Sequence, residues 1–302
     1  MYKVAVLMCT FNGDKYVYKQ ILSIINQKKV NVDIFVIDDG STDNTIKILK
    51  KFKSKIKIFK TQNFKNPTLN FLYLIKKVPQ NYDFYSFSDQ DDIWLKNKLN
   101  YSINTLIKYK GHVLGSRTLY TDKNLKIFGR SPLFKKKVCF ENALVQSIAG
   151  GNTNVWTKKF NKILTNLNYK LPVSHDWFLY QTSTFLGYKF IYCKRPLILY
   201  RQHEDNLVGS NTGFLNMCKR ITMGLKGRYK IWNDMNFFHL MELKKKHKTN
   251  DRLIKTLMDF YEARKIKNPL KKIYIIFFKL KIFRQTFMGN VLLIFAILIN
   301  KI

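Results

Sequence analysis

The sequence has 302 residues, of which 54 are lysine or arginine and 19 are aspartate or glutamate, giving a formal net charge of +35. Hydrophobic residues make up 46% and aromatic residues 15%, which excludes a disordered basic tail and allows one large domain or two moderate ones. So large a positive charge predicts an anionic partner, namely nucleic acid, acidic lipid head groups or a phosphorylated substrate.

In the first 110 residues, short apolar runs alternate with longer segments of helical spacing. The apolar runs predict strands at residues 4–8, 33–37 and 84–87, and the alternation of Lys with Ile and Phe predicts an edge strand at residues 55–59. Apolar stripes and capping residues predict helices at residues 16–25, 41–52, 67–78 and 96–109. This alternation predicts an α/β fold with a mostly parallel sheet and helices on both faces, in which ligands bind at the carboxyl ends of the strands.

The rest of the chain is less regular and ends in a lysine-rich region. The pattern predicts strands at residues 114–120, 188–192 and 196–200, and a helix that begins near residue 175. After about residue 213 the chain is poor in Gly and Pro, so we expect a basic helical region there.

The cysteine pattern and the N-terminus suggest a compartment. The cysteines are far apart and form no C-x-x-C pair; they are Cys9, Cys139, Cys193 and Cys218. We therefore expect neither a disulfide framework nor a zinc ribbon, and a reducing compartment fits best. The apolar run at residues 4–8 is too short for a signal-peptide core, so we interpret it as a strand.

Two carboxylates, Asp38 and Asp39, lie in the sequence D-D-G-S at the end of the second predicted strand. One interpretation is a strand–turn–helix junction in which Asp and Ser cap and Gly40 bends the chain. The other is a ligand site in which one carboxylate binds a base or ribose hydroxyl. The first strand ends in C-T-F-N, whose aromatic ring and small polar groups could flank such a base.

Three carboxylates, Asp89, Asp91 and Asp92, follow the fourth predicted strand in the sequence S-D-Q-D-D. An acidic turn can cap the next helix, but three carboxylates in four residues repel one another and exceed what capping needs. A divalent cation relieves the repulsion, and carboxylate oxygens suit Mg²⁺ or Mn²⁺ that bridges to substrate phosphates. The sequence has neither a P-loop nor a G-x-G-x-x-G dinucleotide loop.

Five sequence motifs occur in an order that resembles a known family. They are V-A-V-L-M-C-T-F-N, V-I-D-D-G-S-T-D, S-D-Q-D-D-x-W, S-H-D-W at residues 174–177 and Y-R-Q-H-E-x-N at residues 200–206. Together they resemble the family-2 glycosyltransferases of the GT-A fold, in wording most like a bacterial rhamnosyltransferase branch, over roughly residues 1–210. The resemblance implies a Rossmann-like GT-A sheet, a nucleotide-diphosphate-sugar donor, Mg²⁺ or Mn²⁺, and an inverting transfer.

The resemblance also implies roles for the matching residues. Asp39 would contact the base or ribose, with Asp38 as the alternate, and Asp91 would bind the metal, with Asp89 nearer the ribose. The expected nucleotide-sugar site comprises Thr10, Phe11, Asn12, Asp38, Asp39, Asp89 and Arg201, whose guanidinium could pair with the diphosphate. Because Asp92 adjoins Asp91, the metal ligand could be either of these two residues. His203 could bind the metal or a phosphate, and a surface histidine is the equal alternative.

On the acceptor side, Asp176 matches the carboxylate that family members use as general base. Without the resemblance, Asp176 at a helix start is equally an N-cap. Glycines allow a close approach of backbone to substrate, although an ordinary loop explains them nearly as well. The acceptor residues that we expect besides Asp176 are Gly150, Gly151, Asn152, His175 and Trp177.

The C-terminal segment is apolar at residues 291–299 and basic before them. A spanning helix needs about 20 apolar residues, so we expect no transmembrane segment. An interfacial helix attracted to anionic lipid fits better, and the alternative is a helix packed on the domain or on a partner subunit. The basic residues that would attract the lipid are Lys271, Lys272, Lys279, Lys281 and Arg284.

We therefore expect a GT-A domain at residues 1–212, with a nucleotide-sugar half at 1–110 and an acceptor half at 111–212, and a helical basic region at 213–302. The expected enzyme transfers a sugar, with dTDP-rhamnose as a candidate donor, to a lipid-linked acceptor in surface-polysaccharide synthesis such as capsule or O-antigen. It would lie on the cytoplasmic face of the bacterial membrane, bound to anionic lipid and not to nucleic acid. The alternative is a basic nucleic-acid-binding protein, which would bind duplex DNA tightly and with a steep salt dependence.

Overall fold

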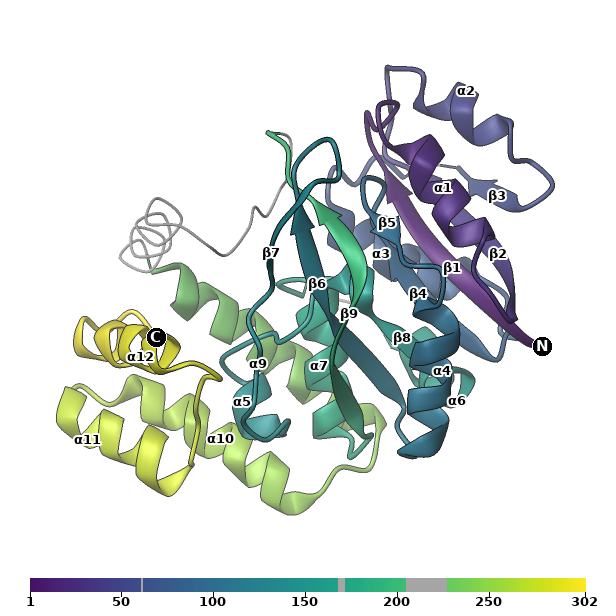
Figure 1. Ribbon diagram of the computed structural model, residues 1–302. Helices are drawn as coiled ribbons and strands as arrows, with labels where there is room; N and C mark the ends of the chain where they lie inside the picture. The colour runs from purple at the N-terminus through teal and green to yellow at the C-terminus, as the bar shows by residue number, and fades with distance from the viewer. Residues whose placement is uncertain (61, 168–171, 205–226) are drawn as a thin grey trace. The chain divides into compact units, whose positions relative to one another are not determined.

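The computed structural model describes residues 1–60, 62–167, 172–204 and 227–302 of the chain. It forms two compact units (Figure 1), and each is described by itself. The sheet unit comprises Met1–Leu133, Ala149–Leu167 and Lys189–Gly209, and the helical unit comprises Phe134–Ile148, Asn168–Tyr188 and Ser210–Ile302. Three features of the sequence analysis lie outside the described residues: the predicted division between residues 212 and 213, Asn206 of the fifth motif, and Cys218.

The first half of the sheet is parallel, as predicted. Its strand order is β3-β2-β1-β4, and β3 forms the edge. The bounds of these strands are Tyr2–Thr10 for β1, Val30–Asp38 for β2, Ile56–Phe59 for β3 and Phe84–Ser88 for β4. Their apolar runs become strands because both faces of β1, β2 and β4 are covered, as in a buried parallel sheet.

The second half of the sheet is mixed, so the expectation of a mostly parallel sheet holds only for the first four strands. After β4 the order continues β8-β6-β9-β5, with β7 paired to β6. Among the described strands of this half, β6 and β9 run parallel and the other pairs run antiparallel. The bounds are Ile93–Trp94 for β5, Val113–Thr121 for β6, Ile127–Arg130 for β7, Val155–Thr157 for β8 and Phe190–Arg201 for β9.

The two strands predicted at residues 188–192 and 196–200 are one strand, β9. Its register against β6 shifts between the pairs Cys193–Ser116 and Pro196–Arg117, so that β9 has extra residues at this point. Proline cannot donate to a sheet ladder and is tolerated at such an irregularity. The sequence break at Lys194 to Pro196 is therefore a bulge within a strand and not a turn between two strands.

Helices cover both faces of the sheet, as predicted. The sheet-unit helices are α1 (Val17–Ile25), α2 (Thr45–Lys50), α3 (Pro67–Lys77), α4 (Lys98–Lys108) and α6 (Lys158–Thr165). Helix α2 begins later than expected, because the Asp43 side chain accepts from the amides of Asp14 and Thr45 and belongs to the preceding turn. Helix α3 begins at Pro67, where the Asn66 side chain caps the amide of Leu69.

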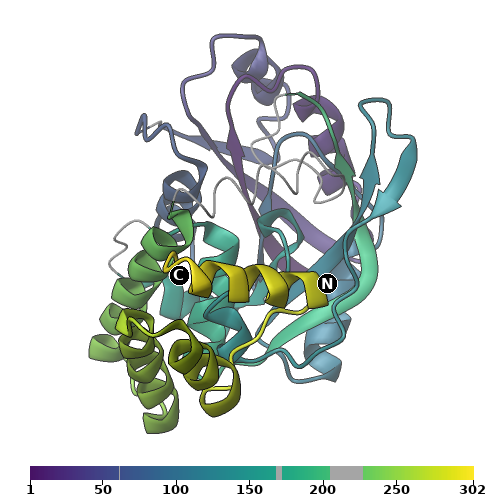
Figure 2. The same ribbon diagram turned by 90° about the vertical axis from the view of Figure 1, so that its left-hand side faces the viewer.

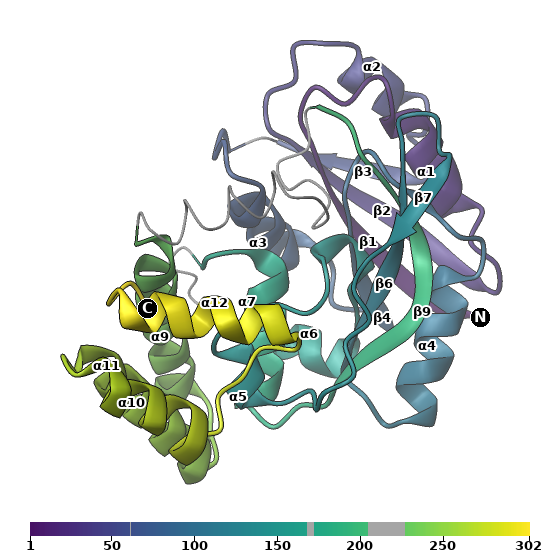
Figure 3. The ribbon, with the colours of Figure 1, turned by 60° about the vertical axis from the view of Figure 1, so that its left-hand side comes forward.

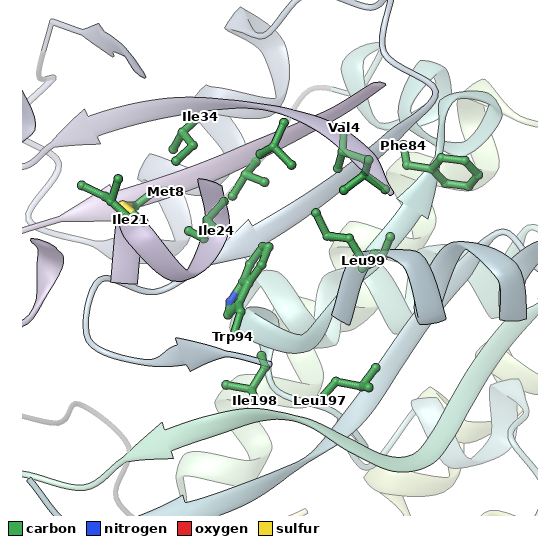
Figure 4. Close-up of a cluster of buried hydrophobic side chains, with 14 of the residues drawn as sticks. Val4, Met8, Ile21, Ile24, Ile34, Phe84, Trp94, Leu99, Leu197 and Ile198 are labelled. Atoms are coloured by element: carbon green, nitrogen blue, oxygen red, sulfur yellow. The ribbon is translucent and has the colours of Figure 1, made fainter. Parts of the chain in front are cut away.

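The core beneath α1 and α4 explains why these segments fold together. Alternate residues of β1, from Val4 to Met8, pack with Ile21 of α1 and Leu99 of α4 in one buried cluster (Figure 4). On the other face, Phe71 of α3 contacts Phe87 of β4, with ring centroids 4.7 Å apart. Because side chains alternate along the strands, the sheet packs against helices on both faces. This packing holds in place the strand ends that carry the sequence motifs.

The helical unit contains the helical C-terminal region that was predicted (Figures 1 and 2). Its elements are α5 (Phe140–Ala143), α7 (His175–Phe185), α9 (Arg228–Lys246), α10 (Asp251–Lys265), α11 (Pro269–Ile273), the π-helical η2 (Tyr274–Lys279) and α12 (Phe287–Leu298). Helices α11 and α12 lie side by side (Figure 3). The Lys272 side chain of α11 donates to Asn300, just after α12. In the described part of the chain, no helix is both long and apolar enough to cross a bilayer.

Candidate active site

The D-D-G-S turn after β2 is organised by Asp38. Its buried carboxylate accepts from the Thr10 hydroxyl at 2.6 Å, and from the amide and hydroxyl of Ser41 at 2.7 and 2.6 Å. Gly40 has a φ of +90°, a conformation that favours glycine. Asp38 and Gly40 therefore perform the turn-forming role that the motif allowed.

Asp39 differs from Asp38 in the surroundings of its carboxylate. Its backbone amide donates to the Thr10 carbonyl at 2.8 Å, which fixes the residue at the end of β1. Its Oδ1 is buried and accepts no hydrogen bond from the described residues. A buried carboxylate oxygen without a donor is costly, so this atom suits a ligand hydroxyl or N–H.

The segment after β1 is bound to both neighbouring loops. The Asn12 amide donates to the Ser41 hydroxyl at 2.8 Å, and the Asn12 side chain accepts from the Thr42 amide at 2.9 Å. The Gln90 side chain accepts from the Phe11 amide and donates to the Phe11 carbonyl, both at 2.9 Å. This pairing fixes the Phe11 backbone and leaves its side chain 56% exposed. No sequence pattern singled out Gln90.

The acidic loop and the D-D-G-S turn meet around Cys9. The pKa of the Cys9 thiol is raised well above its ordinary value by burial and, further, by the charges of Asp89 and Asp39. Both carboxylates therefore act on the same point at the carboxyl end of β1. The structure thus brings together two motifs that are distant in the sequence, at the carboxyl ends of parallel strands.

Asp91 is paired with the end of β9. Its Oδ2 lies 2.9 Å from Nε2 of His203, and its backbone carbonyl accepts from Nε of Arg201 at 2.8 Å. The aromatic ring of Tyr16 lies 4.8 Å from the His203 ring and 4.6 Å from the Arg201 guanidinium carbon. Tyr16 was not predicted as a site residue, although it stands just before α1.

Asp92 makes contacts of another kind. It is fully buried, and its carboxylate accepts from the Asn152 side chain at 2.5 Å and from the Arg201 amide at 3.3 Å. Burial raises the pKa of Asp92, and the charges of Asp91 and Asp89 raise it further. Asn152 and its neighbour Gly151 are buried in the 3₁₀ turn η1 (Gly151–Thr153), whereas Gly150 is exposed.

A buried lysine lies behind the acidic loop. Lys98 at the start of α4 is fully buried, its Nζ donates to the Ser86 hydroxyl at 3.0 Å, and the ammonium lies 3.4 Å from the centroid of the Trp94 ring. Burial lowers the pKa of Lys98 well below its usual range, and the charge of Asp92 opposes that effect.

The acidic loop and His203 fit a divalent cation whose remaining ligands come from the substrate and from water. Within the described ranges, no group of three or more His, Cys, Asp or Glu side chains is arranged to hold a metal. Asp91 Oδ2 and His203 Nε2 nevertheless lie 2.9 Å apart, so one oxygen and one nitrogen are close enough to bind the same cation. Mg²⁺ and Mn²⁺ sites commonly use one or two protein ligands, with substrate phosphates and water completing the shell.

The S-H-D-W residues belong to the helical unit. Ser174 occupies the N-cap of α7, so Asp176 is not the cap; its Oδ2 accepts from the Ser147 hydroxyl at 2.8 Å. Burial lowers the pKa of His175 to about 4, although the charge of Asp176 opposes this effect. Trp177 is buried and its indole donates to the Ala143 carbonyl at 2.6 Å, which makes it part of the core.

Comparison with known proteins identifies the family. Residues 5–172 match the family model described as Glycosyl transferase family 2, which is more than half of the chain. The chain belongs to glycosyl transferase family 2. It is therefore a glycosyltransferase, as the motifs predicted.

A relative and two solved structures extend this result. The chain is 35% identical over 226 residues to the dTDP-rhamnosyl transferase RfbG of Shigella flexneri, covering 71% of this chain and 78% of the relative. The structure of S. aureus TarS 1-349 in complex with UDP aligns with a TM-score of 0.59 and 15% identity, over 99% of this chain and 88% of that one. The mannosyltransferase PcManGT of Pyrobaculum calidifontis, in complex with GDP-Man and Mn²⁺, aligns with a TM-score of 0.55 and 12% identity, over 96% and 78%. These likenesses confirm the predicted GT-A fold.

Proposed function

We propose that this family-2 glycosyltransferase moves a sugar, with inversion and with the help of Mg²⁺ or Mn²⁺, from a nucleotide diphosphate to a lipid-linked saccharide. The product would be a bacterial surface polysaccharide. The relative named a dTDP-rhamnosyl transferase supports dTDP-rhamnose as the donor to test first. The single observation that carries the proposal is the buried Oδ1 of Asp39, which lacks a partner among the described residues at the strand end where the acidic loop also lies.

The nucleoside would be held by the residues that follow β1 and β2. Asp39 Oδ1 would accept a hydrogen bond from the base or the ribose, which would relieve the cost of its burial. The exposed ring of Phe11 would stack on the base, because its backbone is fixed by Gln90 and its side chain is available to the ligand. Thr10 and Asn12 would shape this pocket through their contacts with Asp38 and Ser41.

The diphosphate would be bound beside the acidic loop. Asp91 and His203 are the residues that would hold the metal. Asp89 would lie nearer the nucleoside, because its charge raises the pKa of Cys9 close to the end of β1. A bound divalent cation would neutralise the charge that develops on the departing diphosphate. Arg201 was expected to pair with the diphosphate. Since its guanidinium contacts the Asp91 carbonyl and its side chain is buried, we propose that it braces the loop instead.

The acceptor hydroxyl would be deprotonated by Asp176. Its carboxylate is partly exposed, and the Ser147 hydroxyl donates to one of its oxygens, which orients the group. A base of this kind suits an inverting transfer, because a direct displacement needs one base and no second carboxylate nucleophile. Burial keeps His175 neutral beside it, so no fixed positive charge lies at the neighbouring position.

The helical unit would attach the enzyme to the cytoplasmic membrane face. Helix α12 buries one apolar face, whereas its other face is exposed and includes Phe287, which is 82% exposed, and Phe295. After Glu262 the sequence has nine basic residues and no acidic residue. An exposed apolar stripe in a segment rich in basic residues suits anionic lipid. Lys272 was counted towards this surface, but it is buried against Asn300, so the other basic residues would contribute the charge.

Binding of dTDP tests the nucleotide site directly. Asp39→Ala should weaken dTDP binding, measured by isothermal titration calorimetry, because the buried acceptor is removed. The matched control is Asp33→Ala, which removes a carboxylate within β2, the strand that precedes Asp39, where the Asp33 side chain accepts from the Tyr82 hydroxyl. Equal dTDP affinity in the Asp39→Ala variant and the wild type would contradict the assignment, whereas the control should bind as the wild type does.

A further inference from the structure

The contacts of the buried Asp92 join segments that only the fold brings together. Asn152 lies on the η1 turn, Arg201 is the last residue of β9, and Asp92 itself follows β4 in the acidic loop. Neither contact is available to a substrate, because Asp92 is fully buried. Its neighbour Asp91 instead contacts His203. Adjacent carboxylates in the loop thus have different partners and different tasks.

The position of His203 depends on where the chain runs at the end of β9. The Arg201 amide is held by Asp92, while the Arg201 side chain donates to the Asp91 carbonyl. His203 follows two residues later and meets the Asp91 carboxylate at 2.9 Å. The end of β9 is therefore tied to the acidic loop at three points, of which the Asp92 contact is the one at the β9 backbone.

We infer that Asp92 is a positioning residue: by holding the Arg201 backbone and the η1 turn against the acidic loop, it sets Asp91 and His203 in the arrangement that binds a divalent cation. This inference rests on the proposed metal-dependent function. It also resolves the register of the acidic loop, because it assigns cation binding to Asp91 and support to Asp92. Partners in this supporting layer commonly change metal affinity by about 10–100-fold when they are removed.

The test is Mn²⁺ affinity in the presence of dTDP, measured by electron paramagnetic resonance, which requires no turnover. Asp92→Asn should keep the side-chain shape and weaken Mn²⁺ binding about 10–100-fold. The matched control is Asn161→Leu, which removes a buried hydrogen bond to the Trp156 indole in the same unit and should leave Mn²⁺ affinity unchanged. Circular dichroism verifies that each variant is folded.

If Asp92→Asn does not fold, Asn152→Leu breaks the same contact from the other side and should weaken Mn²⁺ binding in the same way. Unchanged Mn²⁺ affinity in a folded Asp92→Asn or Asn152→Leu variant overturns the inference while leaving the proposed function intact. A loss of affinity as large in Asn161→Leu also overturns it, because general destabilisation would then explain the effect. Absence of Mn²⁺ binding by the wild type would instead refute the metal site itself.

Discussion

Acidification from pH 7 to pH 5 should destabilise the helical unit, because two of its histidines are buried and neutral when folded. Burial lowers the pKa of His239 to about 3, and its Nε2 lies 3.1 Å from the Thr182 hydroxyl. Burial likewise lowers the pKa of His175 to about 4. In the unfolded chain, both side chains titrate near pH 6.5, so the unfolded state takes up protons first as the pH falls.

The sign and size of the effect follow from these values. Because the folded pKa lies below the unfolded one, the stabilisation is complete above pH 6.5 and is lost as the pH falls towards 4 and 3. At pH 5, each histidine lies about 1.5 pH units below its unfolded pKa, which corresponds to about 2 kcal/mol of lost stability per histidine. Together they remove about 4 kcal/mol, a large fraction of the stability of a typical domain.

The free energy of unfolding in urea, followed by tryptophan fluorescence at pH 7, 6 and 5, measures this effect. His239→Gln cannot be protonated in this range and should remove about half of the pH dependence, while His175→Gln should remove most of the rest. A pH dependence that is equally steep in both variants and in the wild type would refute the reasoning. It would mean that carboxylates, and not these imidazoles, govern the response.

Three further predictions concern the site and the surface. Gln90→Leu should weaken dTDP binding by up to about 30-fold in calorimetry, because two hydrogen bonds to the Phe11 backbone are lost at roughly 1 kcal/mol each; wild-type affinity would show that dTDP binding does not depend on these two hydrogen bonds. Asp176→Asn should retain dTDP binding but lower the transfer rate by about 10²–10⁴-fold, as expected for a lost general base; loss of dTDP binding would argue for a structural role. Replacing Phe287 and Phe295 together with Gln should reduce co-sedimentation with phosphatidylglycerol liposomes several-fold. The control is Phe128→Gln, an exposed phenylalanine in the sheet unit, and equal sedimentation of all variants would contradict the membrane role.

In the parallel half, β1, β2 and β4 were predictable because they contain continuous apolar runs buried on both faces. A strand that is buried on both faces has a continuous apolar run, such as residues 4–8. Turns and exposed helices do not contain such runs. The short strands β5, β7 and β8 were not predicted, because their two to four residues contain no recognisable apolar run or alternation of apolar and polar residues. Their pairing is decided by neighbours distant in sequence, as when β8 pairs antiparallel with β4.

The site was predictable as a place but not in its details. The motifs at the ends of β1, β2 and β4 meet because parallel strands end at the same edge of the sheet. This proximity does not depend on the contacts that their side chains make. The different tasks of Asp38 and Asp39, and of Asp91 and Asp92, depend on loop geometry, which has no period that a sequence could reveal.

Lys98 could have been found from the sequence. The buried stripe of α4 consists of Lys98, Leu99, Ser102, Ile103 and Leu106, so the helical spacing places this lysine among core residues. A lysine on the apolar stripe of a helix predicts a buried partner, and the nearest acidic group in the sequence is the loop at Asp91 and Asp92. That signal would have connected α4 with the acidic loop.

The most direct test of the central claim is the release of nucleoside diphosphate from a panel of donors, measured chromatographically with Mn²⁺ and with EDTA. The panel should contain dTDP-rhamnose, UDP-GlcNAc, UDP-glucose and GDP-mannose. We expect the wild type to release nucleoside diphosphate from one donor, with dTDP-rhamnose the first candidate, only when the metal is present, and we expect Asp91→Ala to release none. No release from any donor, or equal release by Asp91→Ala and the wild type, would contradict a metal-dependent transfer at the acidic loop.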